Sequence, residues 1–286
     1  MALFILRALL FPLLDSNHSI HMRPLFFHAI VLLAFGGTAS AATYYQSFSF
    51  PDGTTNLGDG SVLATGGGTT APSVQGGQLQ LTTLGSGGGT NSFSIPAISG
   101  SSLGWSAVFR LTFIDAAGGN PPADGLSFNY GSAVVGALGA AEEGMGGADA
   151  PENLSFEVDT WMNFDAEQGV NISGNHLGAD VGQLAFTNGP ILNDGGVVSG
   201  LVILSWDPLD GASFHTTGLL TDANFSNVAT SFTPSDNHTF NISARVGGAN
   251  ETVLIDDLFI TTVPETSTVA LLGASGMGLL LRRRRR

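Results

Sequence analysis

Short runs of alternating apolar and polar residues fill the middle of the chain, and turn-forming residues separate them. Residues two apart share one face of a strand, so each run is typical of a strand with one face in a core. No stretch shows the 3.6-residue apolar spacing of a helix. Many short strands joined by glycine-rich links predict an all-β domain, a β-sandwich or jelly roll. The clearest runs are 44–50, 78–83, 92–98, 105–114, 125–130, 154–160, 201–206, 239–246 and 252–261.

The first 42 residues have the features of an export signal. Arg23 precedes an apolar stretch over 24–35, and Thr38-Ala39-Ser40-Ala41 has the small-residue spacing that signal peptidases cut. We predict Met22 as the initiator, because residues 1–21 form only a weak apolar stretch. A retained signal anchor is the alternative, but the run is shorter than the ~20 residues of a spanning helix. The mature domain is therefore expected over 43–262.

The C-terminal segment 263–286 has three parts in a fixed order: Val-Pro-Glu-Thr, an apolar run over 269–281, and five arginines over 282–286. This order resembles the PEP-CTERM sorting tail of Gram-negative bacteria, with Thr266 where that family usually has a second proline. The resemblance implies processing by an exosortase-type enzyme and a tail in the inner membrane, its arginines at the cytoplasmic face. An ordinary tail anchor would share this orientation and differ only in being left uncut. We expect the protein in the periplasm, on the outer surface or in the extracellular matrix.

Net charge limits which partners the domain can bind, and cysteine content limits what can stabilise it. The segment 43–262 holds two basic residues, Arg110 and Arg245, against 21 acidic ones, a net charge of −19. Such a surface repels nucleic acid and anionic lipid and attracts cations, although acids also keep exported proteins soluble. The chain has no cysteine, so the core or bound metals must stabilise it.

The segment 157–163 carries the residues with the most distinctive chemistry. Glu157, Asp159 and Trp161 share one face of the predicted strand, while the residues between them point to the core. Two carboxylates on one face repel unless a cation is shared. With the Asn163 amide and backbone carbonyls they suit Ca²⁺, and His176 adds a nitrogen that suits a transition ion such as Mn²⁺ or Zn²⁺. An exposed acidic strand edge with a surface histidine is the alternative.

Three blocks resemble the L-type (legume-like) lectins of the concanavalin A-like fold. The first is Glu-Val-Asp-Thr-Trp-Met-Asn at 157–163, followed by His-Leu-Gly at 176–178. The second is Ala-Asp-Gly-Leu-Ser-Phe at 123–128, and the third comprises 244–251 and 255–258. The blocks keep the order of the family and extend over most of 105–262. The resemblance implies a concanavalin A-like jelly-roll β-sandwich that binds an extracellular or envelope polysaccharide.

The resemblance also implies a two-metal site. Glu157, Asp159 and His176 would bind the transition metal, and Asp159, the Trp161 carbonyl and Asn163 would bind calcium. The spacing from Asn163 to His176 is longer than usual in the family, so Asp165 or Glu167 is the candidate for the second bridging carboxylate.

At the sugar itself, the resemblance implies that Asp124 and Asn163 hydrogen-bond a pair of hydroxyls. Gly147, with Gly146 beside it, and Gly248 are the candidate glycines whose backbone touches the sugar. The peptide bond that joins Ala123 to Asp124 is expected to be cis.

Two other classes remain open. Laminarinase-type β-glucanases share the sandwich and use two carboxylates in a Glu-x-Asp-x-x-Glu strand, but here Met162 or Asn163 follows Glu157 and Asp159 where the second glutamate would stand. No cysteine, serine elbow or phosphate loop supports other enzyme chemistry, so we expect no enzyme. A structural or matrix sandwich without a defined ligand is the third class.

Overall fold

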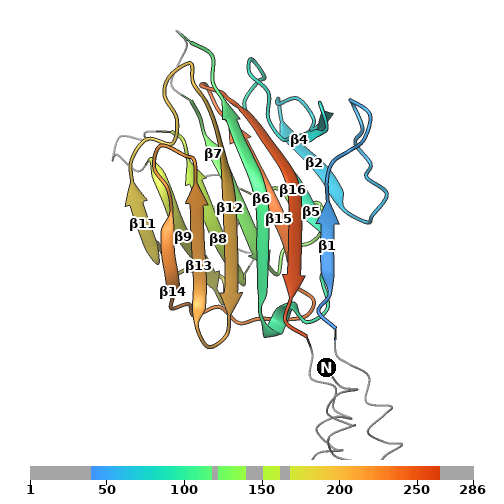
Figure 1. Cartoon of the computed structure of the whole chain (residues 1–286), viewed down its shortest axis with the longest axis vertical. Helices are drawn as coiled ribbons and strands as arrows, with labels where there is room; N and C mark the ends of the chain where they lie inside the picture. Colours follow the sequence, from blue (N-terminus) through green and yellow to red (C-terminus); the bar gives the residue numbers. More distant parts are fainter. Residues whose placement is uncertain (1–39, 118–121, 140–150, 162–167, 265–286) are drawn as a thin grey trace, which may run out of the picture. The chain divides into compact units, whose positions relative to one another are not determined.

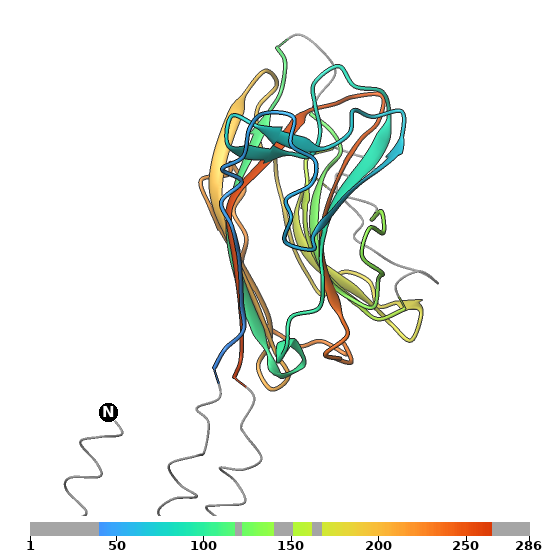
Figure 2. The same cartoon turned by 90° about the vertical axis from the view of Figure 1, so that its right-hand side faces the viewer.

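The computed structural model describes residues 40–117, 122–139, 151–161 and 168–264, and within them the protein is two antiparallel sheets (Figures 1 and 2). The first sheet has the order β14-β13-β12-β6-β16-β4-β3, with β1 paired to β16. Its strands are β14 Asn224–Val228, β13 Gly211–Thr217, β12 Val197–Asp207, β6 Trp105–Ile114, β16 Thr252–Thr262, β4 Gln78–Gln80, β3 Ser73–Gln75 and β1 Thr43–Gln46.

The second sheet has the order β10-β9-β8-β7-β15-β5-β2, with β11 paired to β9. Its strands are β10 Ala179–Asp180, β9 Gly169–His176, β8 Asn153–Asp159, β7 Gly125–Gly131, β15 Thr239–Val246, β5 Gly89–Ile95, β2 Val62–Gly67 and β11 Ala185–Asn188. Figure 2 shows the two sheets as facing layers. The predicted all-β sandwich is confirmed.

Each of the nine predicted strands overlaps an observed one, and 239–246 matches β15 at both ends. The strands that the pattern missed are short or polar. β9 reads Gly-Val-Asn-Ile-Ser-Gly-Asn-His, and β2 ends in two glycines, Gly66 and Gly67. Neighbouring strands impose their extended form on these segments, which local preference alone does not specify.

The core between the sheets is organised around the Trp105 indole at the start of β6. Its ring centroid lies 5.3 Å from that of Phe240, 5.4 Å from Tyr130 and 5.8 Å from Phe156, spacings at which edge-to-face ring pairs attract. Phe156 and Val158 of β8 face this core, as predicted, and both are buried. Alternation therefore sends the side chains of Glu157 and Asp159 to the outer face of the second sheet.

Hydrogen-bonded serines and asparagines line that outer face. Ser155 Oγ donates to Asn129 Oδ1 at 2.7 Å, and Asn241 Nδ2 donates to Ser94 Oγ at 2.8 Å. Residues 132–139 lie over part of the face, where the Ala137 carbonyl accepts from Asn241 Nδ2 at 3.1 Å. The outer face is thus polar in composition, and yet these side chains are buried.

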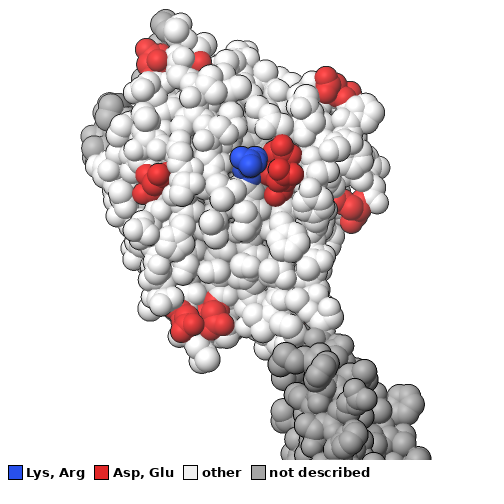
Figure 3. Space-filling model, viewed as in Figure 1, with Lys and Arg blue, Asp and Glu red and all other residues white. Residues whose placement is uncertain are grey.

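The outer face of the first sheet is almost free of charge. Arg110 on β6 lies 3.7 Å from Asp257 on β16. Figure 3 shows one basic patch with acidic atoms beside it, and other acidic atoms scattered towards the margin of this view. The ion pair is half-exposed, so water screens it and it contributes little to stability.

Strand register gives the sandwich two distinct ends. Trp105 at the start of β6 pairs with Thr262 at the end of β16 and with Trp206 near the end of β12. We call this the exit end, because both chain termini leave the sheets there (Figure 1). Ile114 pairs with Val197 and Thr252 at the opposite end, which we call the loop end.

Among the described residues, the structure contains no helix with the length and apolar character needed to span a bilayer.

We predict that Trp105→Ala lowers the free energy of unfolding by about 3–5 kcal/mol, because it leaves a cavity among four aromatic rings. The control is Leu209→Ala, whose side chain is 93% exposed and which should change stability by no more than ~0.5 kcal/mol. Urea denaturation followed by circular dichroism measures both. Equal losses in the two variants would contradict this account of the core.

Candidate functional site

Asp124 lies at the loop end, immediately before β7, and two neighbouring segments fix it. Its backbone N–H donates to the Arg245 carbonyl at 3.0 Å, and its own carbonyl accepts from the Thr160 N–H at 3.3 Å. The carboxylate lies 3.3 Å from Arg245 Nε. The Ala123–Asp124 peptide bond is cis, as the resemblance implied. Asp124 is thus held between the ends of β8 and β15, and only a tenth of its side chain is exposed.

Glycines allow the backbone to pack closely around this carboxylate. Gly125 has φ 124°, and a Cβ there would lie 2.2 Å from the Val158 carbonyl, so no other residue fits without displacing β8. A Cβ on Gly247 would lie 3.2 Å from Asp124 Oδ2. Gly248, a predicted sugar contact, is exposed at this end and faces open space.

Asp159 begins the loop that follows β8. It pairs across the sheet with Gly125, and its Oδ1 accepts from the Trp161 N–H at 2.8 Å. Gln168 Nε2 donates to the Thr160 carbonyl at 2.7 Å and so links the two ends of this loop. The loop residues predicted to bind calcium or sugar, Asn163, Asp165 and Glu167, lie outside the described residues, as does Gly147.

Glu157 faces Asn171 across the β8–β9 pair, on the outer face of the sheet. Ser173 donates a hydrogen bond to the Glu157 carboxylate. Asn171 is buried, and its Oδ1 has no hydrogen-bond partner among the described residues, an arrangement that usually signals a bound ligand, ion or water. Sequence reasoning missed Asn171, because the few apolar residues of 169–176 did not mark that segment as a strand.

The structure does not bring His176 to Glu157 and Asp159, and this part of the predicted metal set is wrong. Asn171 stands opposite Glu157, and His176 is five residues further along β9, about 17 Å away at 3.3 Å per residue. An odd offset also turns its side chain to the other face of the sheet. No group of three or more His, Cys, Asp or Glu side chains suited to a metal is found within the described ranges.

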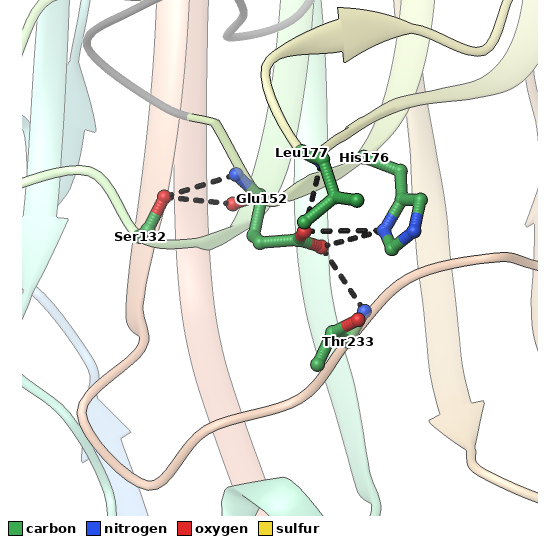
Figure 4. A network of polar contacts seen from close by, with 5 residues as sticks. All are labelled: Ser132, Glu152, His176, Leu177 and Thr233. Carbon is green, nitrogen blue, oxygen red and sulfur yellow. Dashed lines mark hydrogen bonds and ion pairs between the residues drawn. The ribbon is translucent and has the colours of Figure 1, made fainter.

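His176 instead contacts Glu152, which sequence reasoning had not singled out (Figure 4). Its Nδ1 lies 3.1 Å from Glu152 Oε1, and the same carboxylate accepts from the backbone N–H groups of Leu177 at 2.9 Å and Thr233 at 3.1 Å. Burial acts to raise the pKa of Glu152, but these donors outweigh it and lower that pKa. The network joins β9 to the loop before β15 near the exit end.

Glu251 lies under the loop end and is fully buried. Its Oε1 accepts from Thr160 Oγ1 at 2.8 Å, and its Oε2 has no hydrogen-bond partner in the part of the chain that the structure describes. Burial raises the pKa of Glu251 well above the usual range, and the carboxylates of Asp115, Asp124 and Asp159 raise it further against the opposing hydrogen bond from Thr160. The raised pKa favours the neutral form of Glu251 beside these three carboxylates at one end of the sandwich.

Comparison with known proteins identifies the fold. No protein-family model matches the chain, and no curated protein matches it either. Among solved structures it is similar to the winged bean acidic lectin in complex with methyl-α-D-galactose, at 18% identity and a TM-score of 0.56, covering 79% of this chain and 100% of the lectin. The chain therefore has the concanavalin A-like jelly-roll fold, as predicted.

Two further lectins show the same likeness. Peanut lectin has 19% identity and a TM-score of 0.53, covering 80% of this chain and 100% of that one. The exoplasmic/lumenal domain of VIP36, solved with Ca²⁺ and mannose, has 11% identity and a TM-score of 0.52, covering 73% and 85%. At these identities the likeness concerns the fold.

A buried histidine near Glu152 should make folding sensitive to acid. His238 packs against the rings of Tyr130 and Phe232, and no described residue hydrogen-bonds its Nδ1. Burial lowers the pKa of His238, against the opposing effect of the Glu152 carboxylate. The unfolded chain therefore takes up the proton first, and stability falls as the pH drops below about 6.5.

We predict that His238→Phe keeps the ring contacts and reduces this loss of stability between pH 7 and pH 5. The measurement is the free energy of unfolding of both proteins across that range. A wild-type slope retained in the variant would show that other groups cause the acid sensitivity.

Proposed function

We propose that this chain is an exported, envelope-anchored carbohydrate-binding protein whose sugar contacts centre on Asp124 and depend on a bound cation. The observation that carries the proposal is the Asp124 carboxylate, held nearly buried at the loop end beside glycine backbone and beside the loop that follows Asp159. The fold is shared with lectins solved with galactoside and mannose ligands. The predicted PEP-CTERM tail and its exosortase-type processing supply the anchoring part of the proposal.

The chemistry of Asp124 suits a polyol. An ionised carboxylate accepts hydrogen bonds from two hydroxyl groups, and such charge-assisted bonds are the strong ones. Gly248 leaves room for a ring against the backbone, since no atom lies within 4 Å of where its Cβ would be, and Gly247 allows the Asp124 carboxylate to lie close to the same backbone. Asn163, four residues after Asp159 in the sequence, is the proposed second contact.

The described oxygen donors fit a hard cation. Glu157 and Asp159 lie on the same face of β8, and the orphaned Asn171 Oδ1 faces Glu157 from β9. With His176 facing away, this donor set is all oxygen, which favours Ca²⁺ over Mn²⁺ or another transition metal. Such an ion would neutralise the two carboxylates and fix the loop that carries Asn163, with Asp165 or Glu167 as the proposed further ligand.

One observation favours a structural or matrix sandwich as the second candidate. Arg245 already lies 3.3 Å from the Asp124 carboxylate and so neutralises the group that would take the sugar hydroxyls. A sandwich that used this pair only to tie β15 to β7 would need no ligand. Sugar binding therefore requires that the hydroxyls share the carboxylate with Arg245 or displace it.

We predict that Asp124→Asn weakens glycan binding by about 1.5–3 kcal/mol, roughly 10- to 150-fold, because the bonds to a charged acceptor are lost. The control Asp210→Asn makes the same charge change at the exit end and should keep the wild-type affinity. Glycan arrays followed by calorimetry on the best ligand measure both. Failure of the wild-type protein to bind any glycan would favour the structural candidate, and release of sugar products from β-glucans would favour the glycosidase.

We predict that calcium at about 100 times its Kd stabilises the domain by ~2.7 kcal/mol by mass action. Asp159→Asn and Asn171→Ala should each weaken calcium at least about tenfold, whereas His176→Ala should leave the affinity unchanged because it lies with Glu152. Calorimetric titration of calcium into chelator-treated protein gives the affinities. A loss in His176→Ala equal to that in Asp159→Asn would refute this ligand set.

A further inference from the structure

We infer that the exit end of the sandwich is a membrane-facing surface, and that the protein rests it on the zwitterionic lipid surface of the membrane that holds its C-terminal tail. The inference rests on the proposed anchoring and adds to it which surface meets the lipid and where the sugar site then points.

Hydrogen bonds fix the first and the last described segments of the domain to this end. The Val263 N–H donates to the Gly104 carbonyl at 2.9 Å, and the Thr262 N–H donates to the Ala42 carbonyl at 3.0 Å. A Cβ on Gly104 would lie 3.0 Å from Val263 Cγ2 and 3.5 Å from Asp207 Oδ2. One surface is therefore formed by the end of β16, the 3-10 turn Ser101–Leu103 and the β12–β13 hairpin.

The chain beyond this surface is too short to hold it far from a membrane. The apolar run begins at Val269, five peptide steps beyond Pro264, which span at most about 18 Å when fully extended. A tail inserted in the bilayer thus keeps the exit end within that distance of the lipid.

The side chains at the exit end are suited to contact with lipid. Leu209 is 93% exposed at the tip of the β12–β13 hairpin, where Asp207 Oδ1 accepts from its N–H at 2.7 Å. Leu103 and Val263 are exposed on the same surface. Three aliphatic side chains around the point where the chain enters the membrane would lie at the boundary between headgroups and acyl chains.

The charge of the exit end favours zwitterionic over anionic lipid headgroups. Three aspartates lie at this end: Asp207, Asp210 and Asp236. The Ser102 hydroxyl donates a hydrogen bond to Asp236. The two arginines of 43–262 lie elsewhere, Arg110 on the face of the first sheet and Arg245 at the loop end. Anionic headgroups would be repelled here, whereas the ammonium group of a zwitterionic headgroup can approach the carboxylates.

The strands that reach the exit end also set the distance between the proposed sugar site and the membrane. β12 runs from Val197 at the loop end to Asp207 at the exit end, and its eleven residues extend about 36 Å. Asp124, Asp159 and Gly248 would therefore face away from the membrane, open to polysaccharide on the far side.

The experiment compares two exposed aliphatic positions on one hairpin. The chain has no cysteine, so Leu209→Cys and Val197→Cys each accept one environment-sensitive fluorophore in the full chain. Val197 is 68% exposed and serves as the matched control at the loop end. Each protein is reconstituted in phosphatidylcholine–phosphatidylethanolamine vesicles that carry a headgroup-attached quencher, and flotation reports association with the vesicles independently.

We expect strong quenching and a blue-shifted emission from the label at 209, and neither from the label at 197. Adding phosphatidylglycerol to the vesicles should reduce the shift at 209. If the chain floats but the two labels respond equally, or 197 responds more, the membrane-facing surface is refuted while anchoring stands. If the chain does not float, both fail, and glycan binding remains a separate measurement on the same protein.

Discussion

The pairing of β8 between β7 and β9 is the constraint on which the rest of the loop end depends. It places Gly125 opposite Asp159 and so brings Asp124 beside the loop that follows β8. It also places Asn171 opposite Glu157. A shift of one residue in either pairing would turn every side chain of β8 to the other face, and the core contacts of Phe156 and Val158 prevent such a shift. Burial of two apolar side chains thereby fixes the positions of two carboxylates.

Concentrating acids at one end of a lysine-free domain requires specific compensation. The Asp124 carboxylate has Arg245, and the Asp159 carboxylate has the Trp161 N–H. Asp115 accepts from the Gly195 N–H at 2.9 Å. Burial and these neighbouring carboxylates raise the pKa of Glu251, which lies beneath them. An arginine, backbone N–H groups and a raised pKa thus compensate the four acids, and the Thr160 hydroxyl connects the end of β8 to Glu251 in the link before β16.

The sequence predicted well those features that local alternation determines. Apolar spacing located β6, β8, β15 and β16, and therefore the core. It could not locate β9, because that strand's apolar residues are few and its partner sets its register. The prediction for His176 failed for this reason. A His-Leu-Gly motif suggested a ligand, but the offset along the strand, which depends on where the loop ends, sends its side chain to Glu152. Asn171 and Arg245 become informative only once neighbours across the sheet are known.

The length of the strands links the two proposed roles of the domain. A sandwich of short strands would bring the proposed sugar site close to the point where the proposed tail would enter the membrane, and a polysaccharide would then compete with headgroups for space. Here β6, β12 and β16 have 10, 11 and 11 residues and run the full distance between the two ends. Their hydrogen bonds make the sandwich a stiff spacer, so the distance between the loop end and the exit end does not depend on a flexible linker. The same packing that buries Trp105 at the exit end therefore holds Asp124 at the opposite end.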